Sequence, residues 1–127
     1  MDTLTDWLRR WGPSLLVMAL IFRASATPGN DLPDFGVLDF VLKKGAHMLG
    51  YALLGACFVR GLANPSRTVR RMWLLAVALA GLYAMSDEFH QAYTSGRNSS
   101  WIDVGIDVTG AFLGAWIWTR LKRIRRT

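Results

Sequence analysis

Apolar residues along the chain gather in long blocks, whereas a soluble core would show a shorter alternating pattern. A helix that crosses a bilayer needs about 20 predominantly apolar residues. The first block is short for a span and is interrupted by Arg23, so we expect Trp7 and Trp11 to anchor it at the membrane interface. The pattern predicts an all-α, integral membrane four-helix bundle in a single domain, residues 1–127, with helices at about 11–26, 45–63, 72–93 and 104–121.

The first block also has the features of a secretory signal. Arg9 and Arg10 precede an apolar run, and Ala24-Ser25-Ala26 matches an A-x-A cleavage site. We favour a retained first helix, and cleavage is the alternative.

The connection between the first two blocks, residues 27–44, is longer than the others and contains two prolines and three aspartates. Asp34 is suited to an N-cap, and apolar residues follow it at helical spacing. The segment therefore predicts a short interfacial helix that carries Phe35, Leu38, Val41 and Leu42. The other connections, at 64–66 and 95–98, are expected to be short turns.

Charge gives the orientation, because Lys and Arg near span ends accumulate on the cytoplasmic side. If the N-terminus is cytoplasmic, four basic residues lie outside, namely Arg23, Lys43, Lys44 and Arg97. The other eleven lie inside: Arg9, Arg10, Arg60, Arg67, Arg70, Arg71, Arg120, Lys122, Arg123, Arg125 and Arg126. Seven of the nine acids then lie outside. Both termini are therefore predicted to be cytoplasmic in a multi-pass protein of the cell membrane.

The basic composition, with a net charge of +6 and a pI of about 10.3, would suggest a nucleic-acid partner in a soluble domain. Here the basic residues flank apolar blocks, so we expect membrane lipids as partners and no nucleic acid. The sequence does not decide the oligomeric state.

Polar residues inside or beside the spans concentrate at the predicted outer end. Ionisable groups at membrane depth are costly, so they usually face a bundle interior and pair with one another. His47 opens the second helix, and Asp103 and Asp107 open the fourth. The third helix closes with Asp87, Glu88, His90 and Gln91, and the first closes with Arg23. We expect these groups to converge on one site.

Spacing supports a shared site. Lys43, His47 and Tyr51 are four residues apart and share one helix face, and Asp87 and Gln91 do the same on the third helix. The fourth helix carries a stripe of Asp103, Asp107, Gly110 and Gly114, in which the glycines form a small-xxx-small surface for close helix packing. Ser100-Trp101-Ile102-Asp103 also has the pattern of a capping box, which would give Asp103 a structural use.

These motifs resemble the VanZ-like family of bacterial membrane proteins. The resemblance covers about residues 22–116, and two positions depart from it: Ser95, where many relatives have proline, and the segment 23–26, where a Ser-Ser pair is usual. The second departure leaves the role of Arg23 open. The motifs that carry the resemblance are Lys43-x-x-x-His47-x-x-x-Tyr51, Ser86-Asp87-Glu88-Phe89-His90-Gln91, Gly96-Arg97, Ser100-x-x-Asp103-x-x-x-Asp107 and Gly110-Ala111-x-x-Gly114.

The resemblance implies membership in a group named for a protein linked to low-level teicoplanin resistance. Teicoplanin acts on cell-wall precursors outside the cytoplasmic membrane, where the charge pattern places the polar cluster. The expected function is therefore to bind, or act on, an anionic envelope amphiphile such as a lipid-linked cell-wall precursor, and to influence teicoplanin susceptibility.

Roles follow from the side-chain chemistry. Arg97, Lys43 and His47 would hold the head group, with Tyr51 and Asp103 as further ligand-binding residues. Gln91 would orient the ligand by hydrogen bonding. Glu88, His47 and Asp87 are the candidates for catalysis, and Asp107 would help to position the ligand.

Each role has a structural alternative. Glu88 and Arg97 could form a buried ion pair, and Lys43 could extend its charge toward water. On that interpretation the cluster only locks helix packing in a structural or partner-binding subunit. Proton-coupled transport fits less well, because the charges lie near one face. A metal site is a further alternative, because enough nitrogen and oxygen ligands are present: His47, Asp87, Glu88, His90, Asp103 and Asp107. No HExxH or paired Cys/His spacing occurs, so we predict no metal and no cofactor. No nucleophile arrangement is recognisable, and whether the protein is an enzyme stays open.

Overall fold

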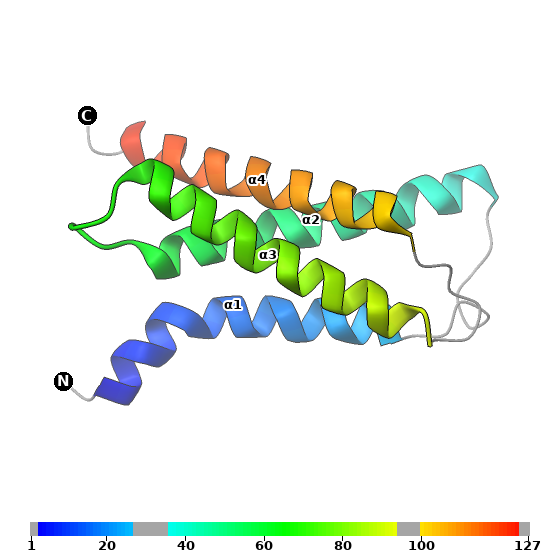
Figure 1. Ribbon diagram of the computed structural model, residues 1–127, viewed down its shortest axis with the longest axis horizontal. Helices are drawn as coiled ribbons and strands as arrows, with labels where there is room; N and C mark the ends of the chain where they lie inside the picture. Colours follow the sequence, from blue (N-terminus) through cyan, green and yellow to red (C-terminus); the bar gives the residue numbers. More distant parts are fainter. Residues whose placement is uncertain (1–2, 27–35, 94–99, 125–127) are drawn as a thin grey trace.

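A computed structural model describes residues 3–26, 36–93 and 100–124, which form helices and short turns and contain no strand. The beginning of α1 and the end of α4 lie at one end of the bundle, together with the α2–α3 turn (Figure 1). α2 and α4 are the most closely associated pair, and α1 packs on α2 and α3. The all-α, four-helix prediction is confirmed, with α1 at Thr3–Ala26, α2 at Val37–Leu62, α3 at Val69–Gln91 and α4 at Trp101–Ile124.

The first helix begins at Thr3, earlier than the predicted start near residue 11. Hydropathy located only the apolar part, whereas residues 3–10 are helical but partly polar and exposed. Pro13 lies inside α1 and cannot donate a backbone hydrogen bond there. Figure 1 shows the first turns of α1 at an angle to the rest, as expected for a helix that is kinked on the N-terminal side of an internal proline.

The second helix begins at Val37, so the boundary predicted at 45 is wrong. The segment expected to form a separate interfacial helix is continuous with α2, because no proline interrupts the chain between Val37 and Leu62. The residue before the helix is Gly36, whose φ of 71° is readily adopted only by glycine. Asp34, the predicted N-cap, lies outside the described residues.

The third and fourth helices differ from their predicted bounds by two or three residues at each end. α3 starts after Thr68, whose hydroxyl oxygen accepts a hydrogen bond from the Arg71 backbone N–H at 3.2 Å. This N-cap satisfies a backbone donor that the helix cannot pair internally.

Glycines allow the backbones of α2 and α4 to approach closely, which confirms the packing role predicted for Gly110 and Gly114. A Cβ added at Gly110 would lie 2.5 Å from the Met48 carbonyl oxygen. One added at Gly114 would overlap the carbonyl group of Ala52, and Gly55 on α2 faces the Ala111 backbone in the same way. Contacts of this kind stabilise helix pairs through van der Waals packing.

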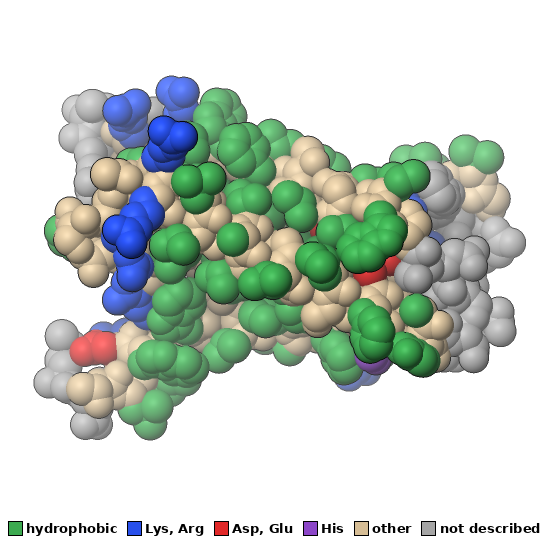
Figure 2. All heavy atoms as spheres, in the orientation of Figure 1, with side chains coloured by type: hydrophobic (Ala, Val, Ile, Leu, Met, Phe, Trp, Pro, Cys, Tyr) green, Lys and Arg blue, Asp and Glu red, His purple; other side chains and the backbone are tan. Residues whose placement is uncertain are grey.

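Apolar side chains occur both in the core and over the outer surface. Leu54, Phe58 and Ala80 are buried among the helices. Large apolar residues are also exposed on every helix, such as Leu16, Leu53, Leu82 and Ile117. Figure 2 shows such side chains over the middle of the visible face, with Lys and Arg side chains gathered at the end where α1 begins. Among the described helices, α3 is the one that is long and apolar enough to cross a membrane by length and hydropathy; the other three spans stay predictions.

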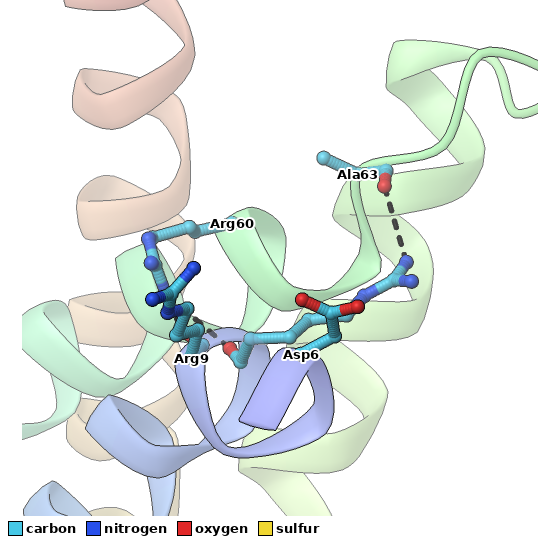
Figure 3. A pocket seen from close by; sticks show the side chains of 5 residues that line it. Asp6, Arg9, Arg60 and Ala63 are labelled. Carbon is cyan, nitrogen blue, oxygen red and sulfur yellow. Dashed lines mark hydrogen bonds between the residues drawn. The ribbon is translucent and has the colours of Figure 1, made fainter. Parts of the chain in front are cut away.

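Two arginines fasten α1 to the end of α2 at this basic end (Figure 3). Arg60 donates to the Arg9 carbonyl oxygen at 2.9 Å, and Arg10 donates to the Ala63 carbonyl oxygen at 3.1 Å and to that of Gly61. The Gly61 and Ala63 carbonyls lie at the end of α2, where intrahelical donors are lacking. The Arg9 carbonyl lacks its intrahelical donor because Pro13 stands four residues later, so guanidinium groups are suitable partners for all three. Together with Asp6, these groups line an open pocket of about 330 Å³.

Candidate functional site

Buried polar side chains meet at the opposite end of the bundle, where α1 and α3 finish and α2 and α4 begin. Most are charged, and each is less than a tenth exposed. Four helices contribute to this polar end, so the convergence depends on the tertiary fold and not on local spacing. The buried members in the described part of this end are Ser25, Asp87, Glu88, Gln91, Asp103 and Asp107.

His47 lies between two aspartates from different helices. Its Nδ1 is 2.9 Å from Asp107 Oδ1, and its Nε2 is 3.4 Å from Asp87 Oδ2. Both aspartate side chains are 1% exposed, whereas His47 is 21% exposed. The imidazole therefore joins α2 to α3 and α4 and also forms the more open side of the cluster. We call His47, Asp87 and Asp107 the histidine–aspartate triad.

Neighbouring polar groups hold the triad from the side of α1 and α2. The Tyr51 hydroxyl donates to Asp87 Oδ2 at 3.4 Å, and the tyrosine is fully buried. Ser25 Oγ lies 3.4 Å from His47 Nε2 and accepts a hydrogen bond from Gln91 Nε2 at 3.0 Å. The structure thus brings the predicted residues His47, Tyr51, Asp87, Gln91 and Asp107 into one network.

Ser25 was not among the site residues predicted from the sequence; it appeared there only within a possible cleavage site and within the segment 23–26 that departs from the family pattern. Its signal was available, because a small hydroxyl residue in the last turn of the first helix lies at the same end as the acids. At 1% exposure and with contacts to both α2 and α3, it ties α1 into the site.

The triad leaves two carboxylate oxygens without partners. Asp87 Oδ1 and Asp107 Oδ2 are buried and accept no hydrogen bond within the part of the chain that the structure describes. A buried oxygen of this kind normally has a hydrogen-bond partner, since desolvation without one is costly. Two carboxylates also face a single imidazole, so an additional cation would improve the charge balance.

Glu88 and Asp103 lie at the same end but serve other groups. Glu88 Oε2 accepts a hydrogen bond from the Ser100 backbone N–H at 3.0 Å, and Asp103 forms an ion pair with Lys44. The predicted capping box is therefore only half correct. Ser100 Oγ does cap α4, because it accepts a hydrogen bond from the Ile102 N–H at 3.1 Å. The Ser100 N–H, however, donates to Glu88 of α3 and not to Asp103, whose carboxylate pairs with Lys44.

The predicted cationic ligands are placed only in part. Lys43 is half-buried near the beginning of α2. Arg97 lies outside the described residues. His90 packs its ring against Phe22, with centroids 4.6 Å apart, in keeping with a structural role.

Comparison with known proteins supports the resemblance drawn from the motifs. A family model described as VanZ/LLP1 matches residues 10–123, nearly the whole chain and all four helices. No curated protein and no solved structure gave a match.

Proposed function

Since the chain belongs to the VanZ/LLP1 family, we propose that it is a multi-pass protein of the bacterial cytoplasmic membrane whose polar end binds an anionic envelope amphiphile on the extracytoplasmic side. The observation that carries the proposal is a mixed cluster at one end of a bundle with an apolar outer surface: Asp87, Glu88, Asp103 and Asp107 are buried there, and Lys43, Lys44 and His47 are half-buried at the same end. A lipid-linked cell-wall precursor has the required chemistry, with an anionic head group and a long apolar chain.

The outer surface supports membrane embedding. Leu16 on α1 is 63% exposed and Leu82 on α3 is 65% exposed. Soluble monomers rarely carry apolar surface on every side, because contact with water is unfavourable. A hydrocarbon environment removes that penalty, so we propose that all four helices cross the membrane.

Cysteine labelling in intact cells tests the orientation. Cys57 is the single cysteine of the sequence, so the Cys57→Ser variant is the background for labelling. In it, Gly96→Cys is expected to react with a membrane-impermeant maleimide, and Ser66→Cys is expected to react only after the membrane is permeabilised. The reason is the concentration of Arg and Lys at the end of the bundle that holds Ser66. A shielded Gly96→Cys with an accessible Ser66→Cys would place the polar end in the cytoplasm and refute the proposal.

The head group of the amphiphile would bind at the outer edge of the polar end, which we call the rim, and not among the buried acids. The triad is already rich in negative charge, so the phosphate would contact Lys43 and Arg97, while His47 would contribute from the edge of the cluster. Gln91 and Tyr51 keep the network in place through Ser25 and Asp87. Any proton transfer would involve Glu88, Asp87 or His47, the residues with side chains suited to acid–base chemistry.

Lipid co-purification tests the ligand. Arg97→Ala is expected to lower the amount of anionic lipid that co-purifies per protein at least about tenfold, since a charge-assisted hydrogen bond contributes about 1.5–3 kcal/mol. Arg97→Lys should retain part of the co-purified lipid, because the positive charge remains. Arg70→Ala, at the opposite end, is the matched control. Mass spectrometry of the extracted lipids provides the measurement, with teicoplanin susceptibility of the cells as a second readout. Equal lipid content in Arg97→Ala and the control would count against the proposal.

A structural lock is the second candidate, favoured by the pairing of Glu88 with Ser100 and of Lys44 with Asp103. Glu88→Gln, measured by lipid co-purification and teicoplanin susceptibility, separates the binding site from the structural lock. The amide oxygen of glutamine can still accept a hydrogen bond from the Ser100 N–H, whereas the carboxylate charge is lost. A protein that stays folded but loses its phenotype supports the binding site. A fall in thermal stability that accompanies the loss supports the lock.

A further inference from the structure

The histidine–aspartate triad has the geometry of a metal-ion site. His47 on α2, Asp87 on α3 and Asp107 on α4 each present one ligand atom, and these atoms lie within 4.8 Å of one another. Ligands around one ion are typically about 3–3.5 Å apart when metal–ligand distances are about 2.0–2.2 Å. Small side-chain rotations would therefore bring the three atoms into contact with a common ion.

The two unpartnered oxygens point independently to a missing ligand. Asp87 Oδ1 and Asp107 Oδ2 belong to side chains that are 99% buried, and neither accepts a hydrogen bond from the described residues. Exposed acids are satisfied by water, but these carboxylates lie among packed helices. A bound cation would satisfy both oxygens and also balance the two carboxylate charges.

We propose that the triad binds one divalent metal ion of the Mn²⁺ or Zn²⁺ type through one imidazole nitrogen and two carboxylates. A mixed nitrogen and oxygen set suits these ions better than Mg²⁺ or Ca²⁺, which prefer oxygen alone. The charge of the ion matches that of the two carboxylates with a neutral imidazole. The sequence predicted no metal because each helix supplies a single ligand, which leaves no local spacing motif.

The surroundings fit this assignment. A metal-bound histidine usually makes a hydrogen bond with its second ring nitrogen, and ligating carboxylates are themselves hydrogen-bonded. Apart from the two aspartates, Ser25 Oγ lies 3.4 Å from His47 Nε2, and the Tyr51 hydroxyl donates to Asp87 Oδ2. Three protein ligands leave coordination positions open to water or to an anionic oxygen. The metal site goes beyond the amphiphile proposal and does not depend on it.

Metal titration of the purified protein in detergent tests the assignment without any lipid ligand. After treatment with EDTA and removal of the chelator, the wild type is expected to bind one Mn²⁺ per chain. Binding is measured as the loss of the EPR signal of free Mn²⁺, and Zn²⁺ should compete for the same site. Asp87→Asn and Asp107→Asn should each weaken binding at least about a hundredfold, since even second-shell changes cost about 10–100-fold. Asp6→Asn, at the basic end, is the control and should leave the affinity unchanged.

The wild type alone can also overturn the proposal, so a variant that fails to fold does not decide the matter. Pulsed EPR of bound Mn²⁺ should show the ¹⁴N coupling of one imidazole, and His47→Gln should abolish it. Absence of saturable binding at about 1 mM metal, absence of the nitrogen coupling, or equal affinity in all variants would each refute the site. None of these results bears on lipid co-purification, so failure of the metal site is distinguishable from failure of the proposed function.

Discussion

Gly114→Ala is expected to destabilise the bundle by about 3 kcal/mol, through overpacking between α2 and α4. The new Cβ would overlap the Ala52 carbonyl group. Because both partners are helix backbones, no flexible side chain can move aside, and the axes must separate. Separation would also weaken the contacts that Gly110 and Gly55 allow along the same interface.

Gly105→Ala provides the matched control on the same helix. A Cβ at Gly105 has no atom of the described residues within 4 Å, and the position is exposed. The substitution should leave stability unchanged or raise it by up to about 1 kcal/mol, from the better helix propensity of alanine. Thermal unfolding in detergent, followed by circular dichroism, would measure both variants. Equal transition temperatures for the two would show that the close α2–α4 approach does not contribute to stability.

The sequence was a good guide to this interface because its signal is local. Gly110 and Gly114 are four residues apart, and helix geometry alone puts them on one face. The number of helices followed equally well from the four apolar blocks. The ends of α1 and α2 did not, since polar helical residues such as those at 3–10 carry no hydropathy signal.

The composition of the polar end was predictable, but its pairing was not. Spacing showed that His47 and Asp107 belong to the same end of the bundle, yet nothing in the chain order indicates that they meet at 2.9 Å. Glu88 illustrates the same limit: its carboxylate takes the Ser100 N–H that a local capping box would have given to Asp103. Contacts between helices depend on axial rotation and register, which are set by packing across the whole bundle.

His47→Leu is expected to destabilise the protein by about 3–5 kcal/mol in the presence of EDTA, which keeps metal out of the comparison. The substitution removes the basic group that lies between Asp87 and Asp107, and leaves two carboxylates that are 99% buried. Breaking a buried ionic contact on one side only is costly, because the remaining charge is neither hydrated nor paired. Leucine fills much of the space of the imidazole, so the loss arises mainly from electrostatics and not from a cavity.

A double-mutant cycle with Asp107→Leu isolates this effect. In His47→Leu/Asp107→Leu the two partners at 2.9 Å are both apolar, and the change in the free energy of unfolding should be smaller than the sum of the single changes by about 1–3 kcal/mol. Unfolding of the wild type, both single variants and the double variant in one detergent gives the four values required. If the changes in the free energy of unfolding are additive, the two side chains contribute separately. The His47–Asp107 contact would then not contribute to holding α2 and α4 together.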